Sequence, residues 1–369
     1  MKTQVKQNCK FFKPDMPCVY HKTDKRKCVE CKDFSNTDGS ILIIKKEAAG
    51  DVLRTTANLE PLKKKFSGYR IIWLVAKQNM EVLKGNPLID TIWTDEKEIL
   101  QAISFFNFNV LINLDLNFDS LITAGISNTK LFYGFRYNKN GEILCSNKAA
   151  EEWFLMSHND EMKKLNRKTY QKIIADITEL DTYENIIVPL EKNAMEKAES
   201  FKETNKLSGK KLIGIHTGGG SRWQAKKWTK KNLVSLLELL TNKKYSVLLF
   251  GGEEEKETME SLANKNNPFL ISTGYKNTIP EFFSLLNLCD VIVSADTLAM
   301  HAAIGLNKKV VALFGPTSPY EIEGYGRIEK IVTPLDCYCC YKKVCDRFSS
   351  CMEMITPETV FSAIEKHYE

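Results

Sequence analysis

The chain has 369 residues, enough for about two domains, and its hydrophobic content of 43% and charged content of 27% are ordinary for a folded globular protein. No stretch reaches the roughly 20 apolar residues of a membrane-spanning helix, and the first residues lack the apolar core of a secretory signal, so we expect a cytoplasmic protein. The net charge of +6 is spread along the chain, without an arginine-rich block that interleaves aromatics. This distribution favours anionic ligands or peripheral contact with an anionic membrane face, and it disfavours nucleic acid as a partner.

Residues 1–38 are polar and rich in cysteine, and we expect them to form an appendage outside the core. Clustered cysteines in a reducing compartment favour a metal site over disulfides, and tetrahedral thiolate sites suit zinc or iron. Free thiols and disulfides, including a bridge to the cysteines near the end of the chain, are the alternatives. The candidate ligands in this segment are Cys9, Cys18, Cys28 and Cys31, with His21 among them.

Residues 39–190 alternate between short apolar runs and helical periodicity, which predicts a parallel sheet covered by helices. The stretch 145–185 is charged and mostly helical. An edge segment is expected at 186–190, which includes Pro189, and the linker to a second domain is expected near it. Strands are predicted at 41–44, 71–75, 91–93 and 110–114, and helices at 50–66, 82–84 and 96–106.

The first motif is ILIIKKEAAGDVLRTT, residues 41–56, in which a strand leads into Gly-Asp at the start of a helix. Gly50 permits a tight turn or a close ligand approach. Asp51 would face a cleft between domains, where a carboxylate can take the proton from an attacking hydroxyl group. The alternative is an ordinary acid that the helix dipole favours. Three cationic side chains near the strand end are candidates to bind acidic groups of an acceptor: Lys45, Lys46 and Arg54.

Residues 191–355 form a second series of alternating apolar runs and helical periodicity and predict a second α/β domain. Residues 356–369 are expected to form a terminal helix, with Pro357 at its first position. Strands are predicted at 212–216, 247–250, 269–271, 291–293 and 310–314, and helices at 191–206, 230–240, 253–263, 279–288 and 298–305.

Two loops of this second half are suited to bind a nucleotide. In GIHTGGGSRWQAKKW, residues 214–228, a strand runs into Gly218–Gly220, whose backbone N–H groups can approach a phosphate, and Lys226 can add a point charge. The alternative is a flexible turn followed by a solvated basic helix start. In LLFGGEEEKE, residues 248–257, one glutamate could bind ribose hydroxyls or an adenine amine, whereas most of these acids serve the helix dipole.

The most informative segment is VIVSADTLAMHAAIGLNKKVVALFGPTSP, residues 291–319. It predicts strand, helix and strand, with polar loops at the C-termini of the strands, the edge at which open parallel sheets bind ligands. Backbone N–H groups at the helix start suit a phosphate. His301 lies one helical turn after Asp296 and Thr297 and can reach the same anion. The alternative is a packed, hydrogen-bonded histidine.

Cysteines gather again near the end of the chain. Cys337-x-x-Cys340, with Cys345 and Cys351, supplies a second set of four thiols, and Cys339 is left over. The spacings match no standard zinc-finger or ferredoxin pattern. Because clustered thiols in a reducing compartment favour a metal, we nevertheless expect a second structural iron or zinc site here, with free thiols or disulfides as the alternatives.

Taken in order, these motifs resemble glycosyltransferase family 9, the heptosyltransferases of lipopolysaccharide core synthesis. The resemblance covers roughly residues 41–369. The segment 310–319 and the Gly-Asp helix start are its most specific parts. The matching motifs are GDVLRTT, KGNPLID at 84–90, HTGGG followed by KKW, FGG, SADTLAMHAA, VVALFGPTSP and CMEMITPE at 351–358.

The resemblance implies a GT-B fold, in which two Rossmann-like domains face each other across a cleft. The N-terminal domain, residues 39–190, would bind the acceptor, a lipopolysaccharide core glycan. The C-terminal domain, residues 191–355, would bind the donor, usually ADP-L-glycero-D-manno-heptose. Family chemistry inverts the anomeric centre and requires no cofactor or metal. The family's catalytic aspartate falls on Asp51, and its donor-binding residues fall on Thr217, Gly218, Gly219, Lys226, Asp296, Thr297, His301 and Glu255, with Glu253 as the other choice for the last.

The chain departs from the family pattern at two places. Leu298 stands where the family has glycine, and Thr229 stands where it has proline. The cysteine-rich segment 337–351 resembles an iron-holding element of the autotransporter heptosyltransferase branch, which glycosylates proteins. A protein is therefore a further candidate acceptor, and a metal in this segment would be structural.

Three alternatives stay open from the sequence. The same scaffold could transfer another nucleotide-activated sugar. A non-catalytic sugar-nucleotide-binding protein would keep the donor loops but would have no need of Asp51, which is present. A metal-stabilised interaction protein would be built on the two cysteine clusters.

Overall fold

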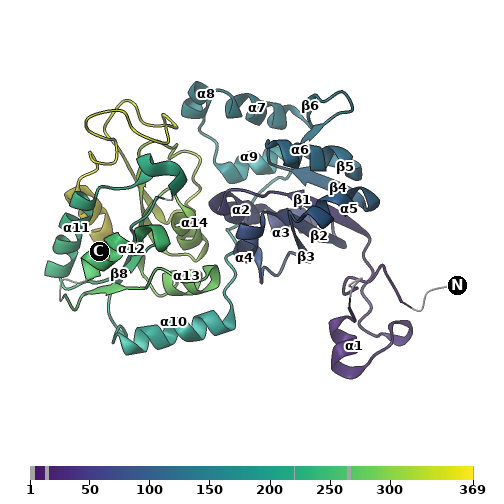
Figure 1. Cartoon of the computed structure of the whole chain (residues 1–369), viewed down its shortest axis with the longest axis horizontal. Helices are drawn as coiled ribbons and strands as arrows, with labels where there is room; N and C mark the ends of the chain where they lie inside the picture. The colour runs from purple at the N-terminus through teal and green to yellow at the C-terminus, as the bar shows by residue number, and fades with distance from the viewer. Residues whose placement is uncertain (1–4, 13–15, 220, 264–266, 369) are drawn as a thin grey trace.

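The computed structural model describes residues 5–12, 16–219, 221–263 and 267–368. Figure 1 shows two α/β halves side by side, with the N-terminal extension projecting from the first half. The extension carries a short helix, α1 (Val19–Asp24). Lys10 in the extension forms an ion pair of 3.2 Å with Asp90 of the first half.

The first half contains a six-stranded sheet with the order β3-β2-β1-β4-β5-β6. The first five strands pair in parallel, and β6 is antiparallel to β5. This is the strand order of a Rossmann fold, which confirms the predicted fold class for this half. The strands are β1 (Gly39–Ile44), β2 (Tyr69–Val75), β3 (Thr91–Thr94), β4 (Asn107–Asn113), β5 (Asn128–Tyr137) and β6 (Ile143–Cys145).

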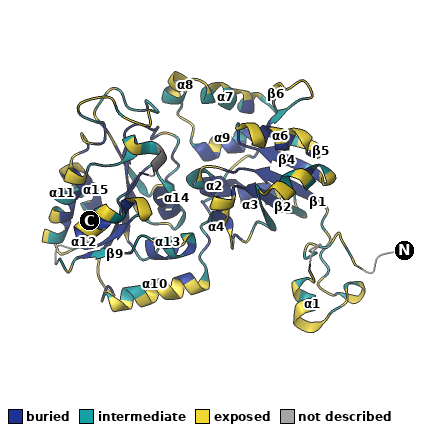
Figure 2. Ribbon diagram, viewed as in Figure 1, coloured by how far each residue is buried: buried dark blue, intermediate teal, exposed yellow. Residues whose placement is uncertain are grey.

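The second half repeats the architecture with the order β12-β11-β10-β7-β8-β9, all in parallel. Its central strands are apolar and buried, apart from His216 at the end of β7, because helices cover both faces of the sheet (Figure 2). The strands are β7 (Leu212–His216), β8 (Ser246–Phe250), β9 (Leu270–Ser272), β10 (Val291–Ala295), β11 (Lys309–Phe314) and β12 (Ile328–Val332).

The predicted helix over 50–66 is interrupted. It forms α2 (Ala49–Thr55), a 3₁₀ turn (Thr56–Asn58) and α3 (Leu59–Lys65). Pro61 explains the break, because it has no N–H to donate and its ring would collide with the carbonyl of Ala57 in a continuous α-helix. The other helices of this half are α4 (Met80–Leu83), α5 (Lys97–Ala102), α6 (Phe118–Ile126), α7 (Lys148–Ser157), α8 (Asp160–Leu165) and α9 (Tyr170–Ile177).

The prediction of an edge segment at 186–190 is wrong. These residues form an extended linker outside both sheets, and Ile187 N donates to the Thr56 hydroxyl at 2.9 Å. The linker is also held by the second half, since Tyr325 Oη donates to the Glu184 carbonyl at 2.7 Å and Arg327 Nη2 donates to Asn185 Oδ1 at 2.9 Å. The chain between the halves is therefore fixed by side chains of both.

The helices of the second half pack on its sheet, and α10 (Lys192–Thr204), which follows the linker, packs on α13. It crosses below α13 in the view of Figure 1 and forms an ion pair with it through Lys197 and Glu281. The terminal helix α15 buries Val360 and Ile364 in the core of this half. The helices are α11 (Lys230–Asn242), α12 (Lys256–Ala263), α13 (Ile279–Leu286), α14 (Leu298–Gly305) and α15 (Pro357–Glu365).

The helices of the described residues are all too short or too polar to cross a bilayer. The two halves meet through helices that begin at the carboxyl edges of their sheets. α2 of the first half lies against α14 of the second, and a β-carbon added at Gly50 would come within 2.9 Å of the His301 ring. This contact brings the two strand-to-helix loops of the sequence motifs together.

We expect Gly134→Ala to unfold more easily than Gly141→Ala. Both glycines have positive φ, +87° and +80°, so both substitutions incur the left-handed backbone penalty. A β-carbon at Gly134 would also collide with the backbone carbonyl of Asn113, whereas Gly141 faces open space. Denaturant unfolding should show an additional loss of about 1–3 kcal/mol for Gly134→Ala. Equal stability of the two variants would contradict the packing of β5 on β4.

Candidate active site

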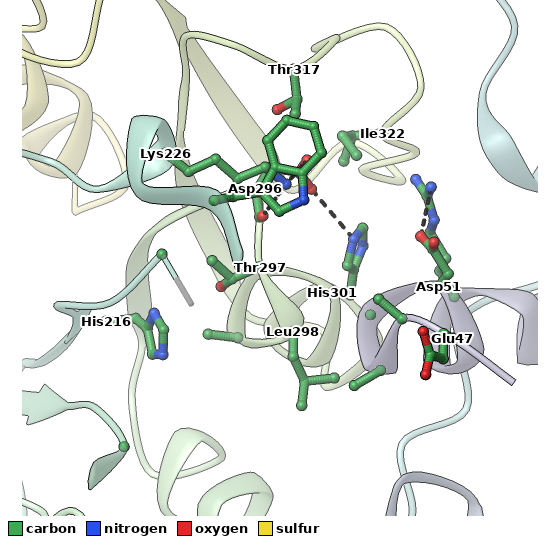
Figure 3. A pocket seen from close by; sticks show the side chains of 18 of the residues that line it. Glu47, Asp51, His216, Lys226, Asp296, Thr297, Leu298, His301, Thr317 and Ile322 are labelled. Carbon is green, nitrogen blue, oxygen red and sulfur yellow. Dashed lines mark hydrogen bonds and ion pairs between the residues drawn. The ribbon is translucent and has the colours of Figure 1, made fainter. Parts of the chain in front are cut away.

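A cavity of about 770 Å³ lies between the two halves. Its lining comes from the loops after β1 and β4 in the first half and from the loops after β7, β8, β9, β10 and β11 in the second. These loops follow the carboxyl ends of parallel strands, where ligands bind in open α/β sheets. Figure 3 shows that Asp51 enters from one side and that Lys226, Asp296 and His301 lie across from it.

Asp51 lies in the first turn of α2 and is paired with Arg54, with 2.8 Å between Oδ1 and Nη2. Burial by itself would raise the pKa of this carboxyl, but the charges of Arg54 and Lys45 outweigh burial and lower it. Arg54 is held in turn by the ring of Tyr170, 3.8 Å from its guanidinium carbon. Asp51 is therefore an ionised carboxylate with a fixed orientation at neutral pH.

The opposite wall carries a second acid paired with a cation. Asp296 follows β10, and its carboxylate accepts from Lys226 Nζ at 3.0 Å. Lys226 also donates to the backbone carbonyl of Asp296 at 3.1 Å. Burial works against ionisation, yet Lys226 and His301 hold the pKa of Asp296 well below its usual range. The ammonium group of Lys226 is therefore held in position before any anionic ligand, such as a diphosphate, enters the cavity.

His301 connects the two walls. It lies in the second turn of α14, with Nε2 at 3.6 Å from Asp296 Oδ1 and its ring against Gly50 of α2. Burial lowers the pKa of His301, Asp296 opposes this effect, and the charge of Arg54 adds to it. Thr297, the residue before α14, lines the cavity beside it. The imidazole is neutral at pH 7 and can gain a proton when an anion binds.

Three predicted donor residues lie behind the cavity wall. Thr217 donates its hydroxyl to the Phe250 carbonyl at 3.0 Å, and Glu255 pairs with Lys227 at 3.3 Å while it accepts from Gly252 N at 3.1 Å. Gly218 lies so close to Glu255 that a β-carbon would reach 2.6 Å from its carboxyl carbon. Of the remaining predicted donor residues, Gly219 lines the cavity, Glu253 is exposed, and Gly220 lies outside the described residues.

The three cations predicted for an acceptor are separated. Arg54 lines the cavity. Lys45 is buried in an ion pair of 2.6 Å with Asp115, and Lys46 contacts Asp119 at 2.5 Å and Asp95 at 3.2 Å. Neither lysine is among the lining residues described for this cavity. Their acidic partners lie far away in the sequence, so the strand-end position alone did not reveal these pairs.

Sequence reasoning missed several lining residues. Glu321 follows the GPTSP loop, and Tyr341 belongs to the cysteine-rich segment, so both had a motif nearby that could have drawn attention to them. The other missed residues either lie inside the quoted motifs without having been singled out, as Glu47, His216 and Trp223 do, or have no local signal. They include Glu47, Asp115, Asn117, His216, Trp223 and Tyr275.

The cysteines are all free thiols in this structure. In the N-terminal extension, the four predicted thiols and His21 line one cavity of about 690 Å³. Near the end of the chain, Cys339 and Cys351 are buried, and Cys339 Sγ lies 3.6 Å from the Thr317 carbonyl. Among the described residues, no three His, Cys, Asp or Glu side chains are arranged to hold a metal ion. The two metal sites therefore stay predictions.

The family model of glycosyltransferase family 9 (heptosyltransferase) matches residues 99–348. This chain belongs to glycosyltransferase family 9. The resemblance stated from the motifs is thereby confirmed. The match includes the loops that carry Lys226, Asp296, His301 and Glu321, and it begins after the loop that carries Asp51.

Two relatives of this family 9 chain show how far the likeness extends. Lipopolysaccharide heptosyltransferase 1 of Campylobacter coli is 24% identical over 319 residues, which are 79% of this chain and 88% of that protein. Lipooligosaccharide heptosyltransferase 2 of Haemophilus influenzae is 29% identical over 148 residues, which are 39% of this chain. The latter match spans 42% of the Haemophilus protein, less than half of its length.

Solved structures share the fold at low sequence identity. A family 9 glycosyltransferase from Veillonella parvula has a TM-score of 0.73 at 19% identity, over 90% of this chain and 97% of that one. The ADP-heptose lipopolysaccharide heptosyltransferase II of Escherichia coli has a TM-score of 0.63 at 17% identity, over 89% and 98%. The iron-containing dodecameric glycosyltransferase TibC of enterotoxigenic Escherichia coli has a TM-score of 0.55 at 12% identity, over 90% and 76%. These likenesses confirm the predicted GT-B arrangement.

We expect His301 to titrate below 6.5, the usual value for histidine, because burial opposes its protonation. Asp296→Asn should lower the pKa further, since it removes the carboxylate that stabilises the imidazolium. Arg54→Met should raise it, since it removes a nearby positive charge. NMR titration of the imidazole carbon-bound protons measures these shifts, and His301→Gln assigns the signal among the five histidines. A midpoint above 6.5 in the unliganded protein would contradict the described environment.

Proposed function

We propose that this protein transfers a heptose from ADP-L-glycero-D-manno-heptose to a hydroxyl group of a lipopolysaccharide core acceptor. The proposal rests on one observation. The ionised Asp51 lies on one side of the cavity, and the cationic Lys226 and the neutral His301 lie on the other. One wall can activate a hydroxyl group, and the other can hold a diphosphate. Membership of the heptosyltransferase family and the named relatives support heptose as the sugar.

In this proposal Asp51 accepts the proton of the acceptor hydroxyl as that oxygen attacks the anomeric carbon. The bond between the anomeric carbon and the diphosphate oxygen breaks, and ADP leaves with the electron pair. Attack from the side opposite the leaving group inverts the anomeric centre. The pairing with Arg54 keeps Asp51 ionised and oriented, so the base is ready before the acceptor arrives.

The leaving diphosphate would meet positive charge supplied by the protein. Lys226 lines the cavity, and so do the first residues of α14, whose free backbone N–H groups suit an anion. His301 can take up a proton as negative charge develops on the diphosphate. The proposed chemistry therefore requires no metal or other cofactor. Leu298 lines the cavity where the family has glycine, and Thr229 caps α11 by accepting from Asn232 N at 3.2 Å.

On the nucleoside side, the loops after β8 and β9 would hold the adenosine. Gly251 and Gly252 line the cavity, and Tyr275 offers an aromatic face. Glu255 would have to leave its pair with Lys227 in order to bind the ribose, whereas Glu253 is already exposed. Closure of the two halves around the donor would bring Thr217 and Gly218 nearer to it.

The acceptor and the location are parts of the same proposal. A lipopolysaccharide core acceptor places the enzyme in the cytoplasm, at the cytoplasmic face of the inner membrane, where the net charge of +6 would favour peripheral contact with anionic headgroups. A protein acceptor is the second candidate. It is favoured by the cysteine-rich segment and by the fold likeness to TibC, which is described as iron-containing.

Calorimetric titration with ADP, ADP-heptose, UDP and GDP tests the donor. We expect selective binding of ADP and ADP-heptose, and a roughly 10- to 100-fold weaker affinity in Lys226→Ala, because a charged hydrogen bond to phosphate is lost. Lys231→Ala is the matched control, since Lys231 is an exposed lysine in the first turn of α11. Asp51→Asn should bind donor normally but lower kcat by about 10²–10⁴.

Two outcomes would contradict the donor assignment in different ways. Preference for UDP or GDP would retain a sugar transferase and remove heptose as the sugar. An absence of binding to every nucleotide would remove the transferase proposal and favour the metal-stabilised interaction protein.

We further propose that the cysteine clusters hold one or two structural iron or zinc ions. Protein purified without oxygen should contain them by elemental analysis, and Cys28→Ser or Cys340→Ser should each lose up to one equivalent. Cys145→Ser is the control, because Cys145 lies in β6 apart from both clusters. Metal-free protein in which the clustered thiols react with a thiol reagent as readily as Cys145 would contradict this proposal.

A further inference from the structure

Two polar side chains of the cavity have no part in the chemistry described so far. Glu321 follows the loop after β11, and Tyr341 belongs to the cysteine-rich segment. Tyr341 Oη donates to Glu321 Oε1 at 3.2 Å. The two residues are 20 positions apart in the sequence, and neither lies on a strand or a helix of the two sheets.

The pair is held by the backbone of both halves. Tyr170 N, at the start of α9 in the first half, donates to the Glu321 carbonyl at 2.9 Å. Tyr341 N donates to the Pro316 carbonyl at 2.8 Å, so the cysteine-rich segment is tied to the same loop. Lys163 of α8 lies over the Tyr341 ring, 5.0 Å from its centroid. Such a pair is pre-organised and loses little freedom when it binds a ligand.

The surroundings of Glu321 place it near the reacting centre. Burial raises the pKa of its carboxyl, while the charge of Arg54 lowers it, and Asp296 and Asp51 add to the rise. It therefore lies within electrostatic reach of both the acid that would activate the acceptor and the acid beside the diphosphate. Burial likewise raises the pKa of Tyr341, so its phenol keeps its proton.

The chemistry of this pair suits a sugar. A carboxyl group can accept hydrogen bonds from hydroxyl groups, and a phenol can both donate and accept. The transferred sugar must lie between Asp51, where the acceptor oxygen attacks, and the Lys226–Asp296 pair, where the diphosphate leaves. We infer that Glu321 and Tyr341 bind hydroxyl groups of the transferred sugar and determine which sugar the enzyme accepts, an inference that rests on the proposed function.

The test compares nucleotide with nucleotide-sugar. Glu321→Gln and Tyr341→Phe keep the shape of the side chains and should leave the Kd for ADP unchanged within about twofold. The Kd for ADP-heptose should rise, and kcat/KM should fall, by roughly 10- to 100-fold, because buried polar groups of the site or the sugar lose their partners. Glu323→Gln and Tyr338→Phe are the matched controls, since they lie in the same two segments outside the cavity lining.

Each other outcome has a stated meaning. Equal weakening of ADP and ADP-heptose would show a structural role for the pair, and unchanged constants for both would show no role; each overturns the inference while the proposed function stands. A rise in KM for the acceptor alone would assign the pair to the acceptor and overturn the inference as well. If the wild type binds UDP or GDP instead, the same comparison with the matching nucleotide-sugar tests the pair. If the wild type binds no nucleotide, the proposed function fails and the inference fails with it.

Discussion

The close contact of α2 with α14 is the constraint on which the site depends. Gly50 has no side chain, and this lets the His301 ring pack against the first turn of α2. The same contact brings Asp51 of the first half into electrostatic reach of His301 and Asp296 of the second. A larger residue at position 50 would separate the two acids and the imidazole, although each half could keep its own fold.

Bringing two acids together has an electrostatic cost that the site meets with two cations. The charge of Asp296 raises the pKa of Asp51, and burial raises the pKa of both carboxyl groups. Arg54 and Lys226 reverse both effects, one on each wall. The charges are thus balanced within each half, so the unliganded cleft can form without a ligand to neutralise it.

The sequence predicted the parts of this molecule that local patterns determine. Buried parallel strands are continuous apolar runs, so the central strands of both sheets were placed correctly, and polar loops after them indicated the cleft. The edge strand β12 was missed because Glu329 and Lys330 interrupt its apolar pattern. Lys45 and Lys46 were expected at an acceptor because their partners, Asp115 and Asp119, are about 70 residues away and only the folded chain brings them near.

The cysteine-rich segment 337–351 is the part of the cleft whose role sequence patterns could least reveal. Its backbone is bonded to both donor-side loops, since Ala225 N donates to the Lys343 carbonyl at 2.9 Å and Tyr341 N donates to the Pro316 carbonyl at 2.8 Å. The first loop carries Lys226, and the second leads to Glu321. Because one short stretch of chain is bonded to both loops, metal binding or oxidation of its thiols would act directly on the supports of the groups that would bind the diphosphate and the sugar. A structural metal here could therefore affect transfer without any part in the chemistry.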